Sequence, residues 1–123
     1  MTIEELEKLI ERARLMAEEY ETKYNEFTKI IYKKPDILSE NILELLVTDI
    51  LSKIDNLRKE GEESFKLLKE CLYYSINLKI DKETIEIIKS SRNNVELSLK
   101  DLNKAYKDFN KIHNMMAMAT KLN

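Results

Sequence analysis

Few residues of this chain could carry out chemistry on a substrate or a metal ion. The sequence has one histidine, His113, and one cysteine, Cys71. Zinc and di-iron sites in helical proteins need several His or Cys ligands or paired Glu-x-x-His motifs, and the sequence contains no Glu-x-x-His. One glycine cannot build a Gly-rich phosphate-binding loop. We therefore expect no catalytic residue, no metal site, no cofactor and no small-molecule substrate, and we interpret His113 and Cys71 as structural side chains.

A row of lysines near the end of the chain is the first candidate for binding. The spacing of four, three and four residues places these side chains on one face of a helix. We call this row the lysine stripe; it consists of Lys100, Lys104, Lys107 and Lys111. It could follow a phosphate backbone, but Asp101 and Asp108 interrupt its surroundings and no aromatic residues are interleaved with it. The alternatives are a solvated face and a nucleic-acid-binding surface.

The C-terminal run from His113 to Ala119 is the second candidate, because it is apolar on nearly all sides of a helix. Its heptad pattern places His113 and Met116 on the buried seam and leaves Met115 and Met118 outside it. Methionine side chains are flexible and suit adaptable interfaces. The run either contacts another chain or packs locally. The candidate partner-binding residues are Met115, Met116, Met118 and His113.

These features favour a non-enzymatic protein-interaction function: an adaptor, an assembly factor or a small subunit of a larger complex. We expect a protein partner or self-association, with a homodimer as the expected oligomer. A nucleic-acid-binding subunit that uses the lysine stripe is the alternative. The net charge of −2 gives no general attraction to nucleic acid or an anionic membrane. We expect a cytoplasmic protein without a membrane segment, since no long uncharged apolar run occurs and the lone cysteine excludes an internal disulfide.

The elements that carry these residues are predicted to be long amphipathic helices. Charged residues make up 36% of the chain, and it has one proline besides the single glycine, which is typical of helical proteins. From Ile3 to Ile31, apolar residues recur every three and four residues, as on the seam of a coiled coil. Thr2 and Glu5 form a capping box, and Pro35 predicts that this first helix ends near Lys33.

The remaining segments leave two architectures open. An N-cap at Asp36 to Ser39 begins the second segment, and charges around Gly61 suggest a helix end followed by a new start. Asp81 is the N-cap candidate of the last segment, which a polar run weakens near Arg92. We predict one all-α domain over residues 1–123, an antiparallel up-and-down helical bundle with coiled-coil-like heptad packing. It has either three long helices, the middle one broken or kinked at Gly61, or four to five helices.

Overall fold

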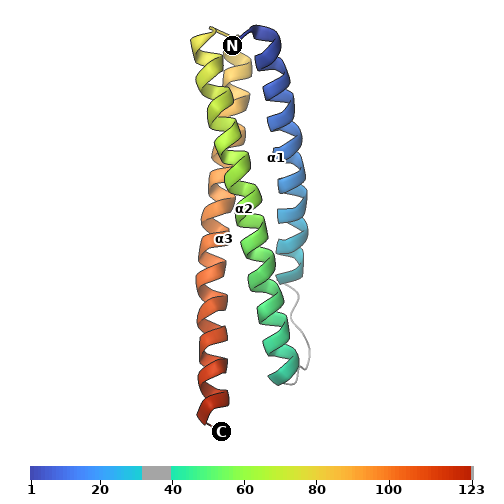
Figure 1. The fold of residues 1–123 in the computed structure, drawn as a ribbon, viewed down its shortest axis with the longest axis vertical. Helices are drawn as coiled ribbons and strands as arrows, with labels where there is room; N and C mark the ends of the chain where they lie inside the picture. Colours follow the sequence, from blue (N-terminus) through green and yellow to red (C-terminus); the bar gives the residue numbers. More distant parts are fainter. Residues whose placement is uncertain (32–39, 123) are drawn as a thin grey trace.

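The computed structural model describes residues 1–31 and 40–122, with side-chain burial for 1–29 and 46–119. Three α-helices account for these residues: α1 (Ile3–Ile31), α2 (Glu40–Asn77) and α3 (Lys82–Leu122). They lie side by side, with α1 and α3 running in the same direction and α2 in the opposite one (Figure 1). The described residues contain no strand, which confirms the predicted all-α class. The alternating directions of the three helices confirm the predicted up-and-down arrangement.

Local sequence signals explain where the helices begin. The backbone amide of Glu5 donates to the Thr2 hydroxyl at 3.1 Å, as expected for the predicted capping box. The amide of Thr84 donates to the Asp81 carboxylate at 3.0 Å, which confirms Asp81 as an N-cap. The predicted helix end near Lys33 and the predicted N-cap between Asp36 and Ser39 lie outside the described residues.

Helix α2 ends in a capping motif that could not be predicted from the sequence. Lys79 has a φ of 53°, in the left-handed region that usually favours glycine. The Ile80 amide donates to the Ser75 carbonyl at 3.0 Å, and the Lys79 amide donates to the Ile76 carbonyl at 3.2 Å. This pair of hydrogen bonds is a Schellman motif with a lysine at C′. It satisfies carbonyl groups that a helix end otherwise leaves unpaired.

Gly61 does not end a helix, so the predicted four-to-five-helix architecture is wrong. Helix α2 continues unbroken through Gly61, and α3 continues through the polar run at Arg92. Gly61 is buried, and a Cβ atom there would lie 2.7 Å from Leu99 Cδ2 and 2.8 Å from Tyr20 Cε2. The glycine thus makes room for side chains from both neighbouring helices. The kink of the three-helix alternative is not confirmed.

Helix α2 forms the centre of the bundle. It packs against both other helices, whereas α1 and α3 approach each other much less. Its inward positions include the small residues Gly61, Ser64, Cys71 and Ser75, all buried. The hydroxyl oxygens of Ser64 and Ser75 have no hydrogen-bond partner within the described part of the chain. The remaining buried side chains are apolar or aromatic: Leu6, Ala13, Tyr20, Phe27, Val47, Ile50, Ile54, Leu57, Leu68, Leu72, Ile88, Val95 and Leu102.

The three helices differ in length, and α1 is the shortest. The final turns of α3 extend beyond the last residue of α1 (Figure 1). The described residues contain no helix that is both long and apolar enough to cross a membrane.

Candidate interaction surfaces

The C-terminal candidate residues lie on two different sides of α3. Met115 and Met118 are 62% and 64% exposed, whereas His113 and Met116 are half-buried. Ile112, which the sequence pattern did not single out, is also 42% exposed. The structure therefore places the two off-seam methionines in solvent. It does not bring all four predicted residues together on one exposed face.

The lysine stripe is exposed along its whole length, and its surroundings contain both signs of charge. Lys100 lies 3.8 Å from Glu96, an exposed pair that contributes little to stability. Asp101, beside the stripe, accepts a hydrogen bond from the Tyr24 hydroxyl at 3.2 Å. Asp108 is also exposed. The acidic residues predicted to interrupt the stripe thus lie at the surface of the same helix.

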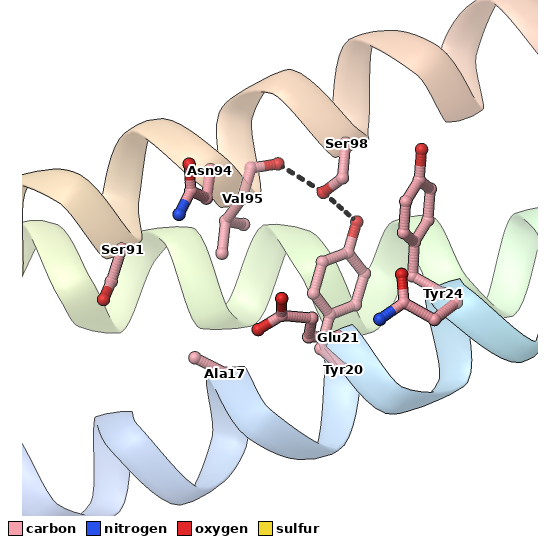
Figure 2. Close-up of a pocket in the computed structure, with 9 residues that line it drawn as sticks. Ala17, Tyr20, Glu21, Tyr24, Ser91, Asn94, Val95 and Ser98 are labelled. Carbon is pink, nitrogen blue, oxygen red and sulfur yellow. Dashed lines mark hydrogen bonds between the residues drawn. The ribbon is translucent and has the colours of Figure 1, made fainter.

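A pocket of about 150 Å³ lies between α1 and α3, which come close to each other at few positions (Figure 2). Its floor is built from Ala17, Tyr20 and Val95, and its rim is polar. Figure 2 shows the Tyr20 ring reaching across from α1 toward Ser98 on α3. The two helices therefore meet through side chains, with small residues at the points of contact.

The hydroxyl groups in this pocket already have partners. The Ser98 hydroxyl donates to the Val95 carbonyl at 2.8 Å, so the Tyr20 hydroxyl is the donor in its 2.6 Å bond to Ser98 Oγ. Burial raises the pKa of Tyr20, which opposes formation of a phenolate. No histidine is close by, since the only one, His113, lies several turns further along α3. The pocket holds a structural hydrogen-bond chain and offers no activated nucleophile.

Two further pockets, of about 300 and about 350 Å³, continue the groove between α1 and α3. The first is lined by Ile10, Ala13, Ile88 and their neighbours, and the second by Phe27, Leu102 and Phe109 among others. Both share residues with the central pocket: Ala17 with the first and Tyr24 with the second. The groove is thus mostly apolar at its base.

Cys71 lies beneath this groove, with 0% of its surface exposed. Burial raises the pKa of its thiol to about 11, so the thiolate that would act as nucleophile or metal ligand is disfavoured. The residues that the structure describes contain no group of three or more His, Cys, Asp or Glu side chains that could hold a metal ion.

Sequence reasoning placed Tyr20 on the seam of the first helix but missed its two partners. Gly61 and Ser98 are the small residues that admit and anchor the ring. The available signal was the presence of small residues at flanking positions of the last helix, including Ser98. That signal indicates close approach but does not identify the approaching side chain.

Comparison of the chain with protein-family models, with curated proteins and with solved structures found no significant match.

Proposed function

We propose that this chain is a non-enzymatic protein-interaction module: an adaptor, an assembly factor or a small subunit of a larger complex. The observation that carries the proposal is the exposure of Met115 and Met118 in the last turns of α3. Removing a methionine side chain from water contributes roughly 1.5–3 kcal/mol, so a partner that covers both gains a substantial apolar contact. The partner surface comprises Met115 and Met118, with His113 and Met116 at its edge.

The proposal also includes coiled-coil-like heptad packing, a homodimer and a cytoplasmic location. Inward residues of α1 recur every seven positions at Leu6, Ala13, Tyr20 and Phe27, which supports coiled-coil-like heptad packing. A second copy is the expected partner, because closed two-fold dimers are the commonest assemblies of soluble proteins. The cytoplasm remains the expected compartment, since a buried, unpaired thiol suits a reducing environment.

The test is deletion of the methionine-bearing end. A chain truncated after Asn114 should remain helical, because Ile85 to Phe109 still supply the inward face of α3, and it should be monomeric where the full chain dimerises. Circular dichroism would check the fold, and sedimentation equilibrium from micromolar to submillimolar concentration would give the mass. A truncated chain that unfolds would contradict the proposal, since the methionines would then belong to the protein's own core.

Pull-down from a lysate of the source organism extends this test to other partners. Met115→Lys with Met118→Lys should lose the bound partner. Leu15→Lys, which also replaces an exposed apolar side chain but on α1, is the matched control and should retain it. Equal capture by both variants would count against a binding role for the C-terminal end.

A nucleic-acid-binding subunit is the second candidate, favoured by the exposure of all four residues of the lysine stripe. Replacing Lys104, Lys107 and Lys111 by Glu should then abolish binding, and the salt dependence should weaken by about one unit per lost phosphate contact. We expect no tight binding of single- or double-stranded probes by the unmodified protein at physiological salt. Sub-micromolar binding there would favour this second function over the first.

A further inference from the structure

A second row of exposed residues runs along α3 and shares Lys104 and Lys111 with the lysine stripe. The spacing of four, three, four, three and four residues keeps these side chains on one face of the helix. We call it the outer row; it consists of Leu97, Asp101, Lys104, Asp108, Lys111 and Met115. Every member is exposed, and the two apolar ones, Leu97 and Met115, are 60% and 62% exposed.

The outer row is symmetric about the level of Tyr106. Its members form three pairs, and the two residues of each pair are equally far from Tyr106 in the sequence. The pairs are Leu97 with Met115, Asp101 with Lys111, and Lys104 with Asp108. Tyr106 itself lies on the inward side, where the guanidinium of Arg58 from α2 is 4.7 Å from its ring centroid. The centre of the row is therefore on the opposite, exposed side of α3, and Asp101, Lys104 and Asp108 there also border the pocket between α3 and α1.

This symmetry makes the surface complementary to itself when it is reversed. We propose that the outer row binds the outer row of a second copy, with the two α3 helices antiparallel and a two-fold axis at the level of Tyr106. Leu97 then meets Met115 of the second copy, Asp101 meets Lys111, and Lys104 meets Asp108. Each contact occurs twice, so the apolar pairs close both ends and the four charge pairs lie between them.

The charge order selects this orientation over a parallel one. In a parallel, in-register pair, Asp101 would face Asp101, and Lys104 would face Lys104, which repels the two helices. Within the described residues no ion pair of the chain itself involves Lys104, Asp108 or Lys111, so these charges are available to a partner. Because the contact is isologous, it closes after two copies and forms no filament.

The size of the row sets the strength of the dimer. From Leu97 to Met115 the helix rises about 27 Å, and one helix diameter gives a contact about 10 Å wide. Two such surfaces bury about 540 Å² in total, below the roughly 1,200 Å² of a stable interface. We therefore expect a weak dimer, whose dissociation constant lies in the high micromolar range. The dimer rests on the proposed interaction function, because Met115 belongs to both surfaces.

Charge reversal at the central pair tests this arrangement. Lys104→Glu places Glu against Asp108 twice in its homodimer, and Asp108→Lys places Lys against Lys104 twice. Each variant alone should dimerise about tenfold more weakly than the unmodified chain. An equimolar mixture should recover dimerisation, because the heterodimer pairs Glu with Lys at one contact and Lys104 with Asp108 at the other. Lys66→Glu, an exposed charge reversal on α2, is the control and should dimerise as the unmodified chain does.

The measurement is sedimentation equilibrium from about 10 to about 500 μM, the range that spans the expected dissociation constant, with circular dichroism as a check of folding. Recovery in the mixture supports the antiparallel contact. A mixture no more associated than its components, or an unmodified chain that stays monomeric throughout, overturns it. The pull-down with Met115→Lys and Met118→Lys tests the proposed function separately. If that double variant loses its partner although the outer-row dimer fails, the proposed interaction function is still supported.

Discussion

The middle of the bundle and the C-terminal end of α3 differ in how their apolar side chains are covered. Around Gly61 the three helices meet, because the Tyr20 ring of α1 and the Leu99 side chain of α3 both occupy the space beside the glycine. Toward the C-terminus, α3 has extended past α1, and Met115 and Met118 are exposed (Figure 1). In the middle, the apolar surface is covered by the chain itself. At the end, the described part of the chain leaves the methionines exposed, and we propose that a partner covers them.

The difference teaches that apolar residues on one helix can have separate roles. Leu102 is 1% exposed and belongs to the bundle, while Leu97 is 60% exposed and belongs to the surface. A core side chain contributes to the free energy of unfolding, whereas a surface one contributes only when a partner is present. Substitutions in the two regions should therefore act on different measurements.

The largest expected effect separates these regions directly. Leu102→Ala should lower the free energy of unfolding by about 3–4 kcal/mol, because it removes a fully buried side chain and leaves a cavity. Met115→Ala should change it by no more than about 0.5 kcal/mol. Urea unfolding followed by circular dichroism, at a concentration where the chain is monomeric, would compare the two. A similar loss in both variants would show that Met115 packs within the bundle.

The next effect concerns the close approach at Gly61. Gly61→Val should cost about 2–3 kcal/mol, because its side chain would overlap the Tyr20 ring and Leu99. Gly61→Ala should cost less, since the better helix propensity of alanine offsets about 1 kcal/mol of the overlap. Thermal unfolding of both variants would show which of them is less stable. A Gly61→Val protein as stable as the original would indicate that α2 opens at this position.

The smallest effect concerns the hydrogen bond between α1 and α3. Tyr20→Phe should lower the free energy of unfolding by about 1 kcal/mol, because it leaves the Ser98 hydroxyl without its Tyr20 donor. Ser98→Ala should have a similar effect, and the double variant should cost no more than about the larger single effect. A double-mutant cycle by urea unfolding measures this coupling. Additive losses would mean that the two hydroxyls act independently.

Much of the fold was predictable because helical periodicity is a strong local signal. The three-and-four spacing in α1 identified Leu6, Ala13, Tyr20 and Phe27 as inward, and all four are buried. The N-caps at Thr2 and Asp81 were also readable, because each depends on residues within one turn. Ile3, at the start of the same seam, is 55% exposed, since the seam pattern does not show where neighbouring helices end.

The errors arose where local and tertiary signals conflict. The charges around Gly61 resemble a helix end, but the glycine is required by Tyr20 and Leu99, which lie far away in the sequence. The residue that does adopt the left-handed conformation at a helix end is Lys79, and a lysine does not indicate such a position in the sequence. For the candidate surfaces, the exposure of Met115 and Met118 followed from their off-seam positions. The link between Tyr20 and Ser98 required the relative register of α1 and α3, which periodicity alone does not define.

That register has a consequence for how the chain reaches its native state. A helix with a repeating apolar pattern can dock on its neighbour in several shifted alignments that bury similar area, and each shifted alignment is a potential kinetic trap. The chain has a single glycine, and the Tyr20 ring occupies the space beside it. Shifting α1 by one or two turns would bring Ala17, Tyr24 or Ala13 to that space and move the Tyr20 ring onto positions that carry a side chain. Gly61 thus discriminates between correct and misaligned docking during folding, a role that the free energy of the native state alone would not reveal.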